Sequence, residues 1–212
     1  MNIVTDLTTQ KRNKERLNVF IDGRYAFSLA VAAATGLKIG QSLSAEDMAD
    51  LKTADTYYQA KQQAVRLLSY RPRSVQEVTQ KLVQKGYDDL VIERVVDHLQ
   101  AVELLNDRAF ADYWVEQRHT FKPRSRLALS HELQKKGINR RVIETAVAAV
   151  DEHEAAHRAV TTKIWQWRDL SQEAFEQKVG QYLQRRGFSY DIIRPVLQQT
   201  WQTVADEQNK AA

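Results

Sequence analysis

The sequence has no cysteine, only seven glycines and three prolines in 212 residues, and no long apolar run. Without cysteine, the chain can form neither a disulfide nor a thiolate metal site, which excludes a disulfide-stabilised secreted domain. The opening residues, MNIVTDLTTQKRNKER, lack the apolar core of a signal peptide, and the longest low-charge stretch, YAFSLAVAAATGL, is too short to span a bilayer. We therefore expect a cytoplasmic protein.

Charge of neither sign is in large excess. Lys and Arg number 31 against 27 Asp and Glu, which gives a net charge of +4 and a pI near 9.2, an imbalance too mild to indicate nucleic-acid binding. The basic residues are nevertheless concentrated, because residues 117–141 contain eight of them and a single acid, Glu132. Such a segment is either a solvated helical face or a surface for an anionic partner.

Apolar residues at spacings of three and four predict that most of the chain after residue 44 is helical. The part before it differs: RLNVFIDGRYAFSL contains two β-type runs joined by Asp22-Gly23, a pair that favours a two-residue hairpin turn. This pairing places Phe20 opposite Tyr25. Ser44, with Asp47 three residues later, is a predicted N-cap of a short helix.

An internal repeat organises the helical part. Three segments, QKLVQKGYDDLVI, SHELQKKGINRRVI and GQYLQRRGFSYDII, carry a glycine at intervals of 51 and then 50 residues. A leucine lies four residues before each glycine and an isoleucine six residues after it. The glycines are Gly86, Gly137 and Gly187, the leucines Leu82, Leu133 and Leu183, and the isoleucines Ile92, Ile143 and Ile193.

Each glycine is suited to end a helix, because it adopts the left-handed conformation that lets the last carbonyls be capped. The capping motif also predicts apolar contacts between the leucine and the residue after the glycine: Leu82–Tyr87, Leu133–Ile138 and Leu183–Phe188. A second helix follows each glycine, and a further helix precedes each pair. Proline and serine in RPRS (71–74) and KPRS (122–125) predict the break and the N-cap between the first two helices of a unit.

The predicted fold is therefore mainly α: three tandem three-helix, helix-turn-helix-like repeats in an elongated array, preceded by a short N-terminal β-hairpin. The predicted domains are residues 1–54 (hairpin plus short helix), 55–105, 106–150 and 151–212 (the three repeats). Because the four tryptophans lie in amphipathic helices, we expect them to pack in the core: Trp114, Trp165, Trp167 and Trp201.

His153, Glu154 and His157 form the pattern H-E-x-x-H, which in zinc hydrolases places two ligands and a catalytic carboxylate on one helical face. A zinc site needs a third protein ligand, and the extended pattern fails because Val160 and Lys163 occupy its later positions. Asp151 is a good N-cap, which places Glu154 at the third helical position. We interpret the string as a chance match and expect neither a metal nor a catalytic site.

The segments LLSYRPRSVQEVTQKLVQKGY, LLNDRAFADYWVEQR and HELQKKGINRRVIETAV resemble the RecX family of bacterial regulators of the RecA recombinase. The resemblance is strong over about residues 55–150 and weaker in the third repeat, through YLQRRGFSYDIIRPVL. It implies a non-enzymatic protein without cofactor that binds the RecA filament on DNA, and suppresses its ATPase and strand-exchange activities or promotes its disassembly. No dimerisation segment is evident, so we expect a monomer without membrane contact.

The candidate binding residues are basic side chains that recur between repeats or lie in the basic segment. Arg140 and Arg141 fall in the first turn of a helix, where the helix dipole disfavours cations, so an anionic partner explains them better. The alternative function is direct DNA binding by helix-turn-helix-like repeats, and weak non-specific DNA contact is compatible with either role. The candidates are Arg71, Arg73, Arg118, Lys122, Arg124, Arg126, Lys135, Lys136, Arg140, Arg141, Arg185 and Arg186.

Overall fold

The computed structural model describes residues 2–211, and the side chains of residues 2–208. Residues 1 and 212, the outer ends of the first and last predicted domains, lie outside the described residues. The chain divides into two compact units, residues 1–105 and residues 106–212.

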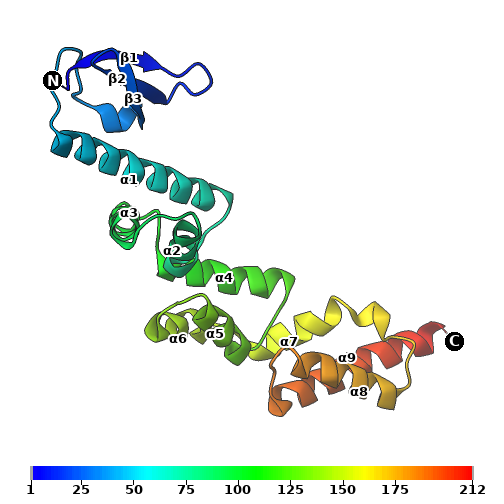
Figure 1. Ribbon diagram of the computed structural model, residues 1–212. Coiled ribbons are helices and arrows are strands. Elements are labelled where there is room, and N and C mark those ends of the chain that lie inside the picture. Colours follow the sequence, from blue (N-terminus) through cyan, green and yellow to red (C-terminus); the bar gives the residue numbers. More distant parts are fainter. Residues whose placement is uncertain (1, 212) are drawn as a thin grey trace. The chain divides into compact units, whose positions relative to one another are not determined.

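The first unit begins with a three-stranded antiparallel sheet of order β1-β2-β3 (Figure 1). Strand β2 (Arg16–Ile21) and strand β3 (Arg24–Ala30) form the predicted hairpin, and Phe20 pairs with Tyr25 as expected. Strand β1 (Val4–Thr9) was not predicted. Its sequence VTDLTT carries little hydrophobic alternation, and only Val4 in it is fully buried, so pairing with β2 rather than the local pattern defines it as a strand.

A short 3-10 helix, η1 (Val31–Ala34), leads from the sheet towards helix α1 (Ala45–Tyr70). The predicted capping box is present, since the Ser44 hydroxyl accepts from the Asp47 N–H and the Asp47 carboxylate accepts from the Ser44 N–H. The helix then continues for 26 residues, so the expected short helix and the first helix of repeat 1 are one element. The predicted boundary between residues 54 and 55 lies inside it.

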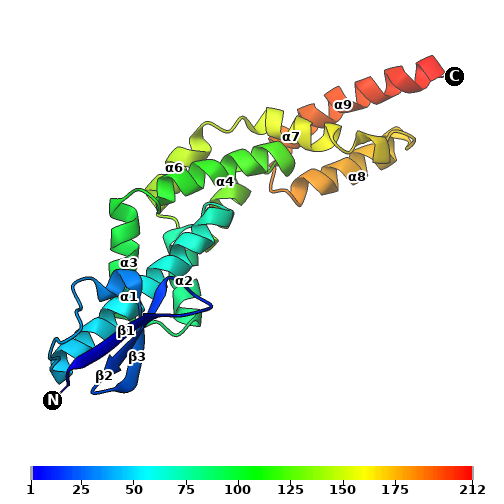
Figure 2. The same ribbon diagram turned by 90° about the horizontal axis from the view of Figure 1, so that it is seen from above.

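Three three-helix repeats follow, as predicted. Repeat 1 comprises α1, α2 (Val75–Gln84) and α3 (Asp89–Ala101), within the first unit. In the second unit, repeat 2 comprises α4 (Asp107–Phe121), α5 (Arg126–Lys135) and α6 (Arg140–Ala148). Repeat 3 comprises α7 (Glu152–Thr161), α8 (Gln172–Gln184) and α9 (Tyr190–Ala211), with α9 alongside α7 and α8 (Figure 2). The division of the chain into four domains at the predicted residue numbers stays a prediction.

The three helix ends marked by glycine have the same backbone structure. Gly86, Gly137 and Gly187 have φ values of 84°, 78° and 87°. In each, the N–H after the glycine donates to the carbonyl of the predicted leucine at 3.2–3.3 Å, and the glycine N–H donates to the next carbonyl at 2.9 Å. This is the two-bond glycine cap, and it confirms that the sequence repeat is a structural repeat.

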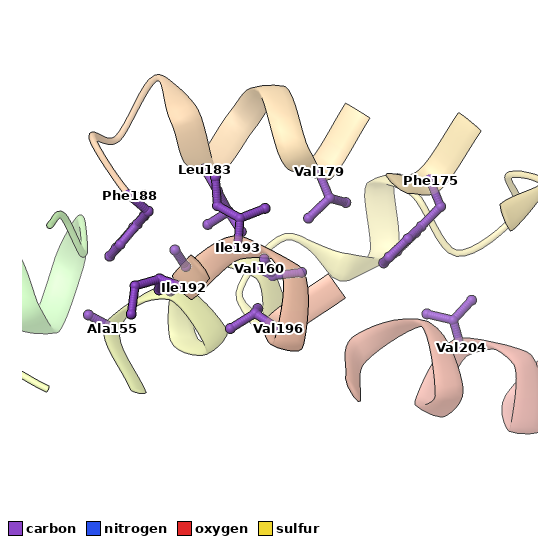
Figure 3. Close-up of a cluster of buried hydrophobic side chains, with 12 residues drawn as sticks. Ala155, Val160, Phe175, Val179, Leu183, Phe188, Ile192, Ile193, Val196 and Val204 are labelled. Atoms are coloured by element: carbon purple, nitrogen blue, oxygen red, sulfur yellow. The ribbon is translucent and has the colours of Figure 1, made fainter. Parts of the chain in front are cut away.

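Each repeat has its own apolar core, and the predicted leucines and isoleucines lie inside it. Leu82, Leu133 and Leu183 are fully buried, and the residue after each glycine packs in the same cluster as its leucine. Figure 3 shows the third core, where side chains from α7, α8 and α9 converge between the helices. Burial of these stripes supplies the main driving force for packing each trio of helices.

Three of the four tryptophans pack against a core as expected, but Trp165 does not. Trp114, Trp167 and Trp201 are partly buried against the cores of repeats 2 and 3. Trp165 is 65% exposed, because helix α7 ends at Thr161 and the residue falls in a 3-10 turn, η2 (Ile164–Gln166). Trp167 also lies beyond the end of α7 but packs against the third core, so the expectation of core packing is wrong for Trp165 alone.

Candidate partner-binding surface

Half of the predicted basic residues are held by contacts within the fold. Arg71 forms an ion pair with Glu77 at 2.9 Å, at the start of α2. The Nε atoms of Arg73 and Arg126 donate to the carbonyls of Leu67 and Val150, at 3.1 and 2.8 Å. Internal contacts also hold Arg118, Arg124 and Arg186. These side chains join helices, so their recurrence in sequence has a structural cause.

Glu132, the single acid of the basic segment, forms ion pairs with two of these arginines. Its carboxylate accepts from Arg118 Nε at 2.7 Å and forms an ion pair with Arg124 Nε at 2.8 Å. It also accepts from Trp114 Nε1 at 2.8 Å, and the Arg118 guanidinium lies 4.4 Å from the centre of the Trp114 ring. This partly buried cluster joins α5 to α4, and both arginines in it are held by the one carboxylate.

Arg186 belongs to a joint between repeats 2 and 3. Its guanidinium donates to the Pro123 carbonyl at 2.8 Å and lies 4.6 Å from the centre of the Tyr182 ring. Its own carbonyl accepts from the Ser125 N–H at 3.2 Å, so the start of α5 rests on the glycine turn that ends α8. The sequence repeat contains both the serine and the glycine, but it gives no sign that they meet.

The other six candidate basic residues differ in how strongly the fold holds them. Four of these candidates are exposed and form no side-chain hydrogen bond or ion pair with any described residue: Lys122, Lys135, Arg141 and Arg185. Arg140 is 91% exposed although it pairs with Glu144 at 2.7 Å, and this carboxylate raises the pKa of the guanidinium. Lys136 is partly buried, 5.1 Å from the centre of the Trp114 ring.

Three of these exposed cations surround one turn. Lys135 ends α5, and Arg140 and Arg141 begin α6, on either side of Gly137. We call residues 135–141 the basic turn. Asn139 caps α6 by accepting from the Arg141 N–H, so the two arginines occupy the positive end of a helix dipole, where cations are unfavourable. Among the described residues, Arg140 pairs with Glu144 and Arg141 forms no ion pair.

The H-E-x-x-H string has an ordinary helical role. Asp151 caps α7 as predicted, accepting from the N–H groups of His153 and Glu154 at 2.9 and 3.0 Å. His157 lies near the Thr161 hydroxyl, 3.4 Å from Nδ1. Among residues 2–211, no group of three potential ligands is arranged to hold a metal ion.

The fold and surface define a helical repeat protein with an exposed basic turn. Four family models match consecutive parts of the chain: "Regulatory protein RecX N-terminal domain" over residues 2–44, and the first, second and third three-helix domains of RecX over 60–99, 106–147 and 151–197. The chain belongs to the RecX family.

Relatives and solved structures agree with this assignment. The chain is similar to "Regulatory protein RecX" of Bacillus pumilus, with 34% identity over 100% of this chain and 82% of the relative. The protein of the same name in Clostridioides difficile is 30% identical, over 93% and 95%. A crystal structure of regulatory protein RecX matches 92% of this chain and 98% of its own, with a TM-score of 0.73 and 25% identity. RecX from Lactobacillus salivarius matches 69% and 97%, with a TM-score of 0.60 and 26% identity.

These proteins are named as regulatory proteins and not as enzymes. Among the described residues, none of the helices combines the length and the hydropathy that a membrane span requires.

Proposed function

We propose that this protein binds the filament formed by the RecA recombinase on DNA and inhibits its ATPase and strand-exchange activities during recombination and repair. The observation that carries the proposal is membership of the RecX family along nearly the whole chain. A regulator of this kind works by occupying a surface of its partner, and a repeat protein supplies a correspondingly extended surface.

We expect the basic turn to be part of this surface. Two cations at the start of α6 cost stability through the helix dipole, about 0.3–1 kcal/mol each at an exposed site. An anionic partner would offset this cost on binding. Arg141 forms no ion pair with a described residue, and Arg140 is almost fully exposed despite its pairing with Glu144. The engaged arginines, in contrast, would have to break an internal contact to bind a partner.

The second candidate function is direct DNA binding, favoured by the exposed cations that lack internal partners. Phosphate contacts by such residues release counterions, so the affinity for DNA should fall steeply as salt rises. DNA binding can accompany inhibition of the recombinase. Binding to bare DNA measures the first activity, and inhibition of the recombinase filament measures the second.

The test reverses the charge of the basic turn. The variant Arg140→Glu/Arg141→Glu should inhibit single-stranded-DNA-dependent ATP hydrolysis by the recombinase about 30-fold more weakly than wild type, with unchanged helicity. Two interfacial charge pairs that contribute on the order of 1 kcal/mol each account for this factor. The matched control is Lys11→Glu/Arg12→Glu, which makes the same charge change at exposed positions of the β1–β2 loop. Undiminished inhibition by the first variant would remove the basic turn from the interface.

Wild-type protein with no effect on the recombinase, but with tight binding to bare single-stranded DNA across a salt series, would favour the second function instead. Inhibition at substoichiometric protein, with weak DNA binding, supports the first.

A further inference from the structure

Helices α5 and α6 leave an open groove of about 540 Å³ beside the basic turn. Its apolar lining comes from Leu127 of α5, Ile143 of α6 and Ile138 of the connecting turn. Its polar lining consists of Ser130, His131, Gln134, Arg140 and Glu144. The groove therefore combines an aliphatic floor with one of the exposed cations already described.

Leu127 is the unusual residue of this groove. It is the second residue of α5 and 61% exposed, whereas Ile138 and Ile143 are buried beneath it. An isolated exposed leucine is ordinary on a protein surface, but one that forms the wall of a concave apolar groove offers contact area to a partner.

Repeats 1 and 3 have different residues at the corresponding positions. Ten residues before the glycine, where repeat 2 has Leu127, they have Gln76 and Gln177. Directly after the glycine, where repeat 2 has Ile138, they have the larger Tyr87 and Phe188, which pack against their own cores. The middle repeat thus combines a smaller residue at the floor with an apolar residue at the wall.

The charges around the groove indicate the chemistry of what binds there. Arg140 lines the groove, and Lys135 and Arg141 are exposed in the same turn. Glu144, the acid of the lining, is already paired with Arg140 at 2.7 Å. A complementary segment would carry an apolar side chain for the floor and carboxylates for the cations. Nucleic acid fits less well, because the lining contains no Phe, Tyr or Trp on which a base could stack.

We propose that the α5–α6 groove binds a protein segment of the recombinase filament in which an exposed apolar side chain is flanked by carboxylates. The proposal rests on the proposed function and adds to it an apolar anchor point, centred on Leu127. The cations attract and orient the segment, and burial of the apolar side chain against Leu127, Ile138 and Ile143 holds it.

The experiment measures binding of the full-length protein to recombinase filaments on single-stranded DNA, together with inhibition of ATP hydrolysis. Leu127→Gln installs the residue that repeats 1 and 3 have at this position. The matched control is Leu90→Gln, because Leu90 is also the second residue of its helix, α3, and is 74% exposed. Circular dichroism checks that both variants keep the wild-type helicity.

The proposal expects Leu127→Gln to weaken filament binding about tenfold and Leu90→Gln to change it less than about twofold. Ile138→Phe, which places the residue of repeat 3 on the groove floor, should also weaken binding. If the Leu127→Gln variant bound the filament as tightly as wild type, the groove would not be a binding site, although the proposed function would still stand. Parallel loss of binding to bare single-stranded DNA would also overturn it, since the groove would then bind nucleic acid. If the wild-type protein did not bind the filament at all, the proposed function itself would be wrong.

Discussion

Replacing Gly187 by alanine tests whether the joint between repeats 2 and 3 is as tightly packed as the structure shows. A Cβ atom added at Gly187 would lie 2.6 Å from Ser125 Oγ and 2.9 Å from Ala128 Cβ. Ser125 Oγ cannot simply move away, because it caps α5 by accepting from the Ala128 N–H at 3.1 Å. The substitution should therefore strain the joint and the helix cap together.

Gly86 provides the matched control. It occupies the same position at the end of α2, with φ of 84° against 87° at Gly187, but a Cβ added there meets no atom within 4 Å. Alanine in the left-handed region costs about 1–2 kcal/mol at either site. Overpacking adds about 1–3 kcal/mol at Gly187 alone, so Gly187→Ala should lower the free energy of unfolding by about 2–5 kcal/mol.

Urea denaturation followed by far-ultraviolet circular dichroism compares the two variants. Tryptophan fluorescence adds a local measurement, because all four tryptophans lie in the unit that contains Gly187, and none lies in the unit of Gly86. Gly187→Ala should shift the fluorescence transition to lower urea, and Gly86→Ala should leave it nearly unchanged. Equal destabilisation by the two substitutions would refute the steric reasoning, since only the shared backbone cost would then remain.

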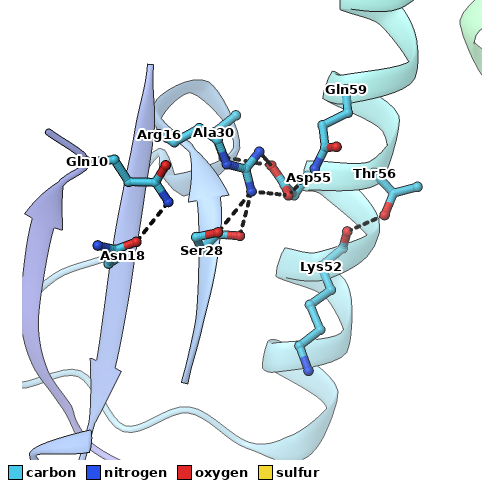
Figure 4. A network of polar contacts seen from close by, with 9 residues as sticks. All are labelled: Gln10, Arg16, Asn18, Ser28, Ala30, Lys52, Asp55, Thr56 and Gln59. Carbon is cyan, nitrogen blue, oxygen red and sulfur yellow. Dashed lines mark hydrogen bonds and ion pairs between the residues drawn. The ribbon is translucent and has the colours of Figure 1, made fainter. Parts of the chain in front are cut away.

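Two further predictions concern carboxylates. Asp55 is 6% exposed and accepts hydrogen bonds from Arg16, the Ala30 N–H and Gln59 (Figure 4). Asp55→Asn should therefore lower the free energy of unfolding by about 2–4 kcal/mol, because it weakens the attachment of the sheet to α1. Hydrogen exchange at the Ala30 amide measures this local opening. The control is Asp112→Asn, which breaks an exposed ion pair with Arg108 and should lower the free energy of unfolding by less than about 0.5 kcal/mol. Equal losses of stability in the two variants would contradict the prediction. The backbone N–H groups of Glu154 and His153 lower the pKa of Asp151 below its ordinary value of 3.8, so its contribution to stability is fully present above that pH and is lost as the pH falls through the lowered pKa. An NMR titration in which Asp151 shows a pKa at or above 3.8 would disprove this.

The repeat, its helix ends and the residues of its cores were predictable from the amino-acid sequence alone. These features depend on interactions between residues close in the chain: glycine ends at Gly86, Gly137 and Gly187, serine and aspartate caps, and apolar positions three and four residues apart. The hairpin around Asp22-Gly23 was predictable for the same reason. Local interactions of this kind leave a periodic pattern that a single sequence displays.

Which basic residues are held by internal contacts, in contrast, depends on how the helices pack and was not predictable. Arg186 contacts Pro123 across 63 residues, and Glu132 engages both Arg118 and Arg124, while Arg141 in the same basic segment is exposed without such a contact. Strand β1 is likewise defined by its pairing with β2. The groove beside Leu127 is lined by residues of both α5 and α6, so it too depends on how two helices pack. Contacts of this kind form between elements that are separate in the sequence. The residue pattern within one element does not show which other element lies beside it.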